Sequence, residues 1–109
     1  MSFDRELMKG STSLIILNIL KEYDMYGYQI AKEMTRRSEE QLDVKEGTLY
    51  PALHKLEKKG YVTSYLKEQD KGPARKYYRL TQEGLIILKQ KKKEWNIFSK
   101  MIDGMLEGE

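Results

Sequence analysis

The 109-residue sequence contains no cysteine, a single histidine and a single tryptophan, and it has no long hydrophobic run. Without cysteine there are no disulfides, no thiolate zinc ligands and no thiol nucleophile. The apolar run from Leu14 to Leu17 is far too short to cross a bilayer, and the first residues lack the hydrophobic stretch of a signal peptide. We therefore expect a cytoplasmic protein with no membrane partner, built as one domain with at most one appended helix.

The sequence also lacks the usual marks of an enzyme. Its one histidine, His54, lies in a basic segment, and no pair of carboxylates is placed for acid–base chemistry. There is no glycine-rich phosphate loop and no metal-ligand spacing. We therefore expect no catalytic residue, no metal site and no cofactor.

The charge of the chain is weak overall but unevenly placed. The net charge is only +3, yet residues 45–80 contain nine Lys and Arg against four Asp and Glu. The rest of the chain is net acidic. This basic middle third indicates a nucleic-acid surface, although a solvated charged surface would give the same pattern.

Residues 45–60 predict one short helix with two unlike faces. Leu49, Leu53 and Leu56 recur at helical spacing and form an apolar stripe. We expect Pro51 near the start of this helix, where its missing N–H is not needed, and the helix end at Gly60. The other face carries groups that suit a DNA groove, with Thr48 and His54 for base edges and Tyr50, Lys55 and Lys58 for phosphates.

Two helices are expected before this stretch. The first runs from Asp4 to about Tyr23 and is apolar around most of its circumference, which implies burial on more than one side. The second runs from about Tyr26 to Ser38, with Asp24 as a candidate N-cap. Three helices with this spacing are compatible with a helix-turn-helix, although many small bundles share it.

A β-hairpin is expected directly after the central helix. Residues 61–66 and 75–80 are rich in β-branched and aromatic side chains, and residues 68–73 are typical of a turn. A hairpin in this position is the wing of a winged helix-turn-helix. Lys71, Arg75 and Lys76 would then meet phosphates or the minor groove, unless the hairpin only covers the core and its charges are solvated.

The last helix is expected from about Gln82 to Leu106, with Thr81 as its N-cap. Its apolar residues follow a heptad-like spacing over a length greater than that of most globular helices, which favours contact with a second subunit. We expect a homodimer seam formed by Leu14, Ile15, Leu88, Trp95, Phe98, Ile102 and Met105. The fold is then mainly α with a small β-hairpin: a winged helix-turn-helix over residues 1–80 and a dimerisation helix over residues 81–109.

The motifs described above resemble, in order along almost the whole chain, the PadR-type transcriptional regulators of the short class with one C-terminal helix. The resemblance rests mainly on Gly-Thr-Leu-Tyr-Pro at residues 47–51 and Gly-Pro-Ala-Arg-Lys-Tyr-Tyr at residues 72–78. Tyr-Gly-Tyr-Gln-Ile at residues 26–30 and Trp95 also match. The resemblance implies a winged-helix dimer that represses transcription from an inverted-repeat operator and is released by a small molecule.

The resemblance also implies roles for single residues. Thr48, Tyr50 and Pro51 should face DNA with His54 and Lys55, while Arg75 and Lys76 serve the wing. The hydroxyls of Tyr26 and Tyr28 would reach the DNA backbone, with core packing as an equal alternative, and Gly27 would permit a close helix approach. The sequence departs from the family before Gly47, where Lys45 and Glu46 replace a capping residue such as Ser. An acid close to DNA could shift the preferred site.

Trp95 has two interpretations. In similar multidrug-responsive members, a tryptophan at the matching place stacks on flat aromatic compounds between subunits. An effector site of this kind would use Trp95 and Phe98 as stacking surfaces, with Met8, Ser11, Leu14 and Ile15 as its wall. We favour plain packing, because an interface tryptophan more often packs than binds a ligand. The competing function for the whole chain is a winged-helix module that binds a protein partner without specific DNA binding.

Overall fold

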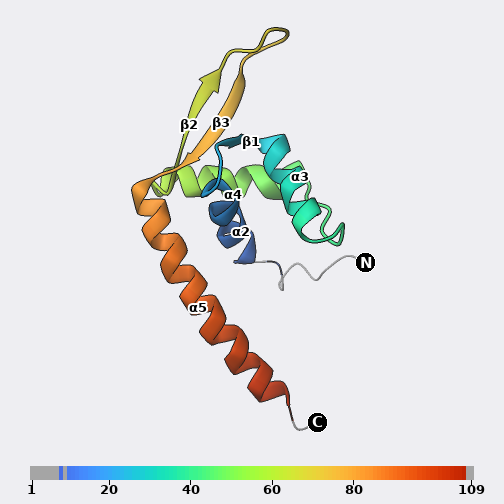
Figure 1. The fold of residues 1–109 in the computed structure, drawn as a ribbon, viewed down its shortest axis with the longest axis vertical. Coiled ribbons are helices and arrows are strands. Elements are labelled where there is room, and N and C mark those ends of the chain that lie inside the picture. Colours follow the sequence, from blue (N-terminus) through green and yellow to red (C-terminus); the bar gives the residue numbers. More distant parts are fainter. Residues whose placement is uncertain (1–7, 9, 108–109) are drawn as a thin grey trace.

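The computed structural model describes residues 8 and 10–107 (Figure 1). Its elements are α2 (Ser11–Leu20), β1 (Met25–Tyr26), α3 (Gly27–Arg37), α4 (Glu46–Lys58), β2 (Val62–Lys67), β3 (Arg75–Leu80) and α5 (Gln82–Leu106). Three helices and a three-stranded antiparallel sheet form a winged helix-turn-helix, and the long helix α5 follows it. The predicted fold class is confirmed.

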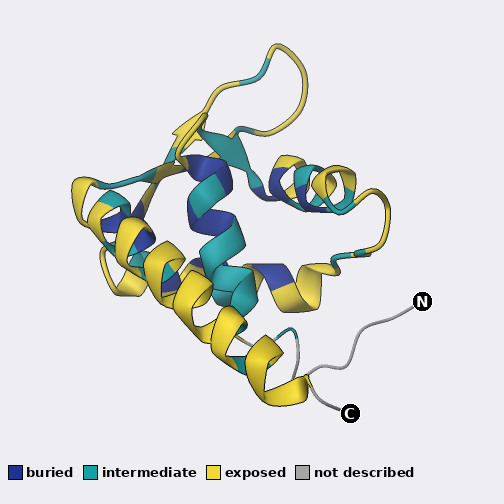
Figure 2. Cartoon of the chain, turned by 60° about the horizontal axis from the view of Figure 1, so that its bottom comes forward, coloured by how far each residue is buried: buried dark blue, intermediate teal, exposed yellow. Residues whose placement is uncertain are grey.

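Helix α2 lies at the centre of the core. Its Ile16, Leu17 and Ile19 have no exposed surface, because α3, α4, β3 and α5 pack around it (Figure 2). The remaining core residues are Leu20, Ile30, Met34, Leu49, Leu53, Leu56, Val62, Tyr78 and Leu88. The apolar side chains predicted around the first helix are therefore largely buried within one chain.

The bounds of this helix differ from the prediction. Gly10 has φ 86°, a left-handed conformation that a right-handed helix cannot continue through, so α2 begins at Ser11. The helix ends at Leu20, and residues 21–22 form a turn. A single helix from Asp4 to Tyr23 was therefore wrong, and residues 4–7 and 9 of that prediction lie outside the described residues.

The sheet has the order β1-β3-β2. The hairpin pairs Val62 with Leu80 at its base and Lys67 with Arg75 near its tip. The two-residue strand β1 was not predicted, because residues 24–27 carry only a break signal. It pairs Met25 with Tyr78 and Tyr26 with Tyr77, so that the start of α3 is tied to the return strand of the wing.

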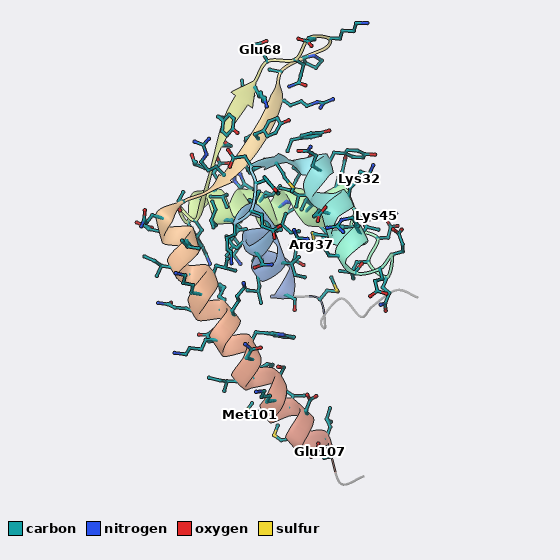
Figure 3. All side chains as sticks on the ribbon, viewed as in Figure 1. Lys32, Arg37, Lys45, Glu68, Met101 and Glu107 are labelled. Atoms are coloured by element: carbon teal, nitrogen blue, oxygen red, sulfur yellow. The ribbon has the colours of Figure 1, made fainter. Side chains whose placement is uncertain are left out.

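An ionic cluster joins the end of α3 to the turn after α2. The Arg37 guanidinium donates to Glu22 and, at 2.8 Å, to Glu33, while Arg36 also donates to Glu33 (Figure 3). The hydrogen bonds from Arg36 and then Arg37 hold the pKa of Glu33 at about 2, well below its usual 4.5. This cluster links the end of α3 to the turn after α2.

Helix α5 begins at a tight junction with the hairpin. The predicted N-cap Thr81 is confirmed: its hydroxyl accepts from the Gly84 N–H at 3.0 Å and donates to the Gly60 carbonyl at 2.7 Å. From there α5 and the hairpin extend in opposite directions from the helical core (Figure 1). In the described part of the chain, no helix is both long and apolar enough to span a membrane.

Candidate nucleic-acid interface

Helix α4 has the two faces that its sequence predicts. Leu49, Leu53 and Leu56 are at most 3% exposed and hold the helix against the core. The predicted DNA-facing residues all lie on its exposed side; they are Thr48, Tyr50, Pro51, His54, Lys55 and Lys58. The structure therefore gathers six predicted site residues on one accessible helix face.

The position of Pro51 requires a correction. It lies inside α4, more than a turn beyond the first residue Glu46, and not in the first turn where a helix can do without the N–H. The missing N–H leaves the carbonyl of Gly47 without its intrahelical partner. Because Gly47 and Pro51 are both exposed, water or a bound surface can satisfy that carbonyl.

Tyr50 is held by the start of α3. A Cβ placed on Gly27 would lie 2.5 Å from the Tyr50 hydroxyl oxygen and 2.8 Å from the ring carbon that bears it. Only glycine leaves room for the phenol, so Gly27 permits a close approach of α3 and α4 as the resemblance implied. Tyr50 remains 43% exposed and presents its outer side to solvent.

The wing residues do not lie together. Arg75 and Lys76 are neighbours on β3 and therefore point to opposite faces of the sheet. The Arg75 guanidinium lies 4.6 Å from the centre of the Tyr26 ring, on the outer face. The Lys76 ammonium lies 3.7 Å from the Glu57 carboxylate on α4, on the inner face. Lys71 is exposed in the turn at the hairpin tip.

Glu57, which the sequence analysis did not single out, connects α4 to the wing. Its carboxylate accepts a hydrogen bond from the Ser64 hydroxyl on β2 and pairs with Lys76 on β3. The contact depends on the position of the hairpin relative to α4, which helix periodicity alone does not give. One of the predicted phosphate ligands, Lys76, is therefore shared with an internal acid.

A row of four tyrosines runs from α3 across the outer face of the sheet. The sequence analysis named Tyr26 and Tyr28 but did not predict the row, and Tyr28, at 60% exposed, is not part of the core. The Tyr26 ring lies 6.4 Å from that of Tyr28 and 5.4 Å from that of Tyr77, which in turn lies 5.8 Å from Tyr65. Cations cover these rings at 4.6–5.4 Å; they are Lys32, Arg75, Lys67 and Arg79. The period-two spacing of Tyr65 and Lys67, and of Arg75, Tyr77 and Arg79, was the available signal.

Asp24 closes this row at the end away from α3. It accepts hydrogen bonds from the Tyr65 hydroxyl at 2.7 Å and from the Arg79 Nε at 3.0 Å, and it forms an ion pair with the Arg79 Nη2 at 2.9 Å. The hydrogen bond to the Asp24 carboxylate raises the pKa of Tyr65. Asp24 is therefore not the N-cap of α3; Tyr26 occupies that position, and its N–H donates to the Gln29 side chain at 3.3 Å.

The predicted dimer residues fall into three groups. Leu88 is only 1% exposed within a single chain and belongs to its own core, so its assignment to a subunit interface was wrong. Leu14, Ile15 and Ile102 are half-buried. Further along α5, Trp95, Phe98 and Met105 are 49%, 52% and 67% exposed, as Figure 2 shows for most of that helix. The described residues of one chain therefore leave about half or more of each of these three side chains uncovered.

A shallow hollow of about 390 Å³ lies on this part of α5. Its lining is mostly apolar and consists of Leu14, Lys91, Glu94, Trp95, Ile97, Phe98 and Met101. Met8, Ser11 and Ile15, which we expected in an effector wall, are half-buried and do not line it in a single chain. Within the described residues there is no cluster of His, Asp and Glu that could hold a metal ion.

The fold and the exposed polar and basic face of α4 beside a basic wing define a winged helix-turn-helix DNA-binding protein. The model of the transcriptional regulator PadR-like family matches residues 16–90. The chain belongs to this family, whose members are transcription regulators and not enzymes.

Solved and curated relatives support the same assignment. A transcriptional regulator from Clostridium thermocellum is 41% identical with a TM-score of 0.87, and the alignment covers 94% of this chain and 99% of that one. A PadR family regulator from Clostridium difficile is 42% identical with a TM-score of 0.76, covering 89% and 99%. A transcriptional regulator of Mycobacterium tuberculosis is 34% identical over 77% of this chain and 75% of its own length.

Proposed function

We propose that this DNA-binding regulator is a homodimeric repressor that binds an inverted repeat. Two copies joined through α5 would place their α4 helices in successive major grooves about one helical turn apart. The observation that carries this proposal is the uncovered apolar side of α5. It includes Trp95, Ile97, Phe98, Met101, Met105 and Leu106, each about half exposed or more on a helix that extends away from the core.

A second copy of the chain is the partner that best fits this exposed apolar face. Monomeric proteins rarely leave a contiguous apolar patch of this kind open to water. A twofold dimer would bury the same patch from both subunits at once, because such an interface is self-complementary. It would also present two recognition helices related by the same axis, which an inverted repeat matches.

At each half-site, the division of labour follows the chemistry of the exposed side chains. Thr48, Tyr50 and His54 would contact base edges and set the sequence. Other residues would contact the backbone and set the affinity; they are Tyr26, Tyr28, Lys55, Lys58, Lys71, Arg75 and Lys76, with Pro51 packed close to the duplex.

A small aromatic effector between the subunits would release the operator. The hollow beside Trp95 and Phe98 supports such a site, because in a dimer its open side would be closed by the partner. A ligand that prefers one angle between the subunits would prevent both α4 helices from meeting their half-sites together. Titration of planar aromatic compounds against the emission of Trp95, the single tryptophan, tests this step.

The test of the dimer combines oligomeric state with DNA binding. Sedimentation and fluorescence anisotropy are measured for the wild type, for Phe98→Glu on the apolar side of α5, and for Lys100→Glu on its polar side. The duplex carries the gene's own upstream region and is compared with a scrambled duplex over a salt series. A dimer that neutralises several phosphates gives a log–log salt slope of about 0.9 per phosphate.

We expect the wild type and Lys100→Glu to be dimers that prefer the upstream duplex, and Phe98→Glu to be monomeric with weak, unselective binding. A Phe98→Glu protein that remains dimeric and selective contradicts the proposed interface. If the wild type shows no preference for any duplex, the alternative function as a protein-interaction module is favoured.

A further inference from the structure

Helix α4 carries two acids, and only one of them has a partner among the described residues. Glu57 near its end accepts from Ser64 and pairs with Lys76. Glu46 at its start is exposed and makes no hydrogen bond or ion pair with any other described residue. The neighbouring Lys45 does not neutralise it, because the Lys45 ammonium pairs with Asp43 at 2.9 Å. A bare carboxylate therefore stands at the entrance of an otherwise basic recognition helix.

The position of Glu46 places it at the base edges. Tyr50 and His54 follow Glu46 by one and two helical turns on the same exposed side of α4. Glu46 also borders the groove between α3 and α4, together with Lys45 and with Lys32 of α3 (Figure 3). In helix-turn-helix complexes the N-terminal residues of the recognition helix contact base edges, so Glu46 would be among the first side chains to enter the major groove.

Gly47 gives an independent reason to expect a close approach here. A Cβ on Gly47 would meet no atom within 4 Å, so nothing in this chain requires a glycine at that position. Its φ is not positive, and glycine favours a helix less than alanine does. The chain therefore keeps a destabilising residue beside Glu46 without any benefit to its own packing. A surface from outside the chain that comes close to the start of α4 would account for it.

The chemistry of the carboxylate restricts which part of DNA it can meet. A carboxylate only accepts hydrogen bonds, and phosphates repel it. In the major groove the donors are the amino groups of cytosine and adenine. Adenine presents its N7 acceptor next to the amino group, which repels a carboxylate, whereas cytosine presents no acceptor of its own beside N4. Guanine and thymine offer only acceptors or a methyl group at this edge.

We propose that Glu46 is a specificity-determining residue that accepts a hydrogen bond from the N4 amino group of a cytosine, and so selects a C·G pair at one position of each half-site. The inference rests on the proposed function as a sequence-specific dimer. An adenine at this position would place its N7 acceptor beside the amino donor, and a guanine or thymine edge would offer the carboxylate only acceptors or a methyl group. We therefore expect a preference for cytosine of about tenfold at that position.

The experiment selects bound duplexes from a randomised pool with three proteins: the wild type, Glu46→Gln and Glu107→Gln. Glu107 is an exposed acid at the far end of α5, so its variant loses the same charge away from the DNA side (Figure 3). Anisotropy titrations with duplexes that differ at the single selected base pair then give the fold-preference of each protein.

We expect the wild type and Glu107→Gln to enrich C·G at two symmetry-related positions, each with about tenfold preference. Glu46→Gln should lose that preference or shift it to adenine, whose N6 and N7 a glutamine amide can bind together. It should also bind non-specific DNA more tightly, since one repulsive charge is gone. The same cytosine preference in Glu46→Gln and the wild type overturns the assignment of Glu46 alone. A wild type that enriches no sequence overturns the proposed function itself.

A second variant tests the close approach separately. Gly47→Ala should raise the thermal stability of the protein, because alanine favours the helix and meets no atom of the chain. It should nevertheless weaken binding of the selected duplex about tenfold. Unchanged affinity in a stabilised Gly47→Ala protein would show that the start of α4 stays away from the bases, and would overturn the proposal.

Discussion

The junction between α5 and the hairpin makes a sharp prediction about one glycine. Gly84 is buried in the first turn of α5, where a Cβ would lie 2.0 Å from the Tyr61 carbonyl oxygen and 2.7 Å from the Leu80 side chain. Ordinary contact at the carbonyl begins at 3.4 Å, so Gly84→Ala requires α5 and the base of the hairpin to separate by about 1.4 Å. The Tyr61 carbonyl belongs to the backbone, so it cannot change rotamer to make room as a side chain can.

Two opposing effects set the change in the free energy of unfolding of Gly84→Ala. Overpacking in a filled site costs about 1–3 kcal/mol, and a backbone obstacle favours the upper end of that range. Alanine in place of a helical glycine stabilises the helix by about 1 kcal/mol. We therefore expect Gly84→Ala to lower the free energy of unfolding by about 2 kcal/mol, which corresponds to a fall in melting temperature of about 10 °C for a domain of this size.

Gly104→Ala is the matched control, since it is the same substitution in the same helix at a position where a Cβ meets nothing within 4 Å. It should raise the free energy of unfolding by up to about 1 kcal/mol. Thermal and urea denaturation of both variants and the wild type, at one protein concentration, measure the difference. If both substitutions shift stability in the same direction, the close contact between Gly84 and Tyr61 does not govern this junction.

Three further predictions concern the DNA-binding unit. Gly27→Ala should push the Tyr50 phenol out of its place and weaken specific DNA binding by about tenfold in anisotropy titrations, with less than about 1 kcal/mol change in stability because a side chain can move aside. Glu33 has a folded pKa of about 2 against a usual 4.5, so its contribution of about 1 kcal/mol should be present above pH 4.5 and lost as the pH falls toward 2. Urea denaturation of Glu33→Gln and wild type should therefore differ at pH 7 and converge near pH 2. Arg75→Ala should reduce the salt slope of DNA binding by about 0.9, whereas Lys76→Ala should reduce it less, since Lys76 also neutralises Glu57.

A different result would contradict each of these three predictions. A Gly27→Ala protein with unchanged specific affinity would mean that the seat of Tyr50 is not used on DNA. A constant stability difference for Glu33→Gln from pH 7 to pH 2 would exclude the ionic cluster as its source. Equal salt slopes for the Arg75 and Lys76 variants would mean that both faces of the hairpin meet the backbone equally.

The sequence was sufficient where local chemistry decides structure. The leucine spacing of α4, the aromatic strands of the hairpin and the Thr81 cap each act over a few residues, and each was predicted correctly. The predictions failed where the position of a residue depends on contacts with residues far away in the sequence. Leu88 fits a heptad seam equally well whether it contacts its own core or a second chain, and only the fold distinguishes these cases.

The candidate site shows the same division. Helical spacing was enough to place Thr48, Tyr50 and His54 on one exposed face. The role of Asp24 was not accessible in this way, because its partners Tyr65 and Arg79 come from the hairpin, more than 40 residues further along the chain. Side chains alternate between the two faces along a strand. The sequence alone therefore predicts that Arg75 and Lys76 lie on opposite faces of the wing.

The junction at the base of α5 gives a physical route from the dimer helix to the DNA face. Gly60, at φ 83°, ends α4, and the Tyr61 N–H donates to the Leu56 carbonyl at 3.0 Å. The Tyr61 carbonyl accepts from the Thr81 N–H at 3.1 Å, and Thr81 in turn caps α5. The end of the recognition helix, both strands of the wing and the start of α5 are thus bonded at one point. A change in the direction of α5 would therefore carry α4 and the wing together as one body, so that in the proposed dimer an effector would act on the distance between half-sites and not on the contacts within one half-site.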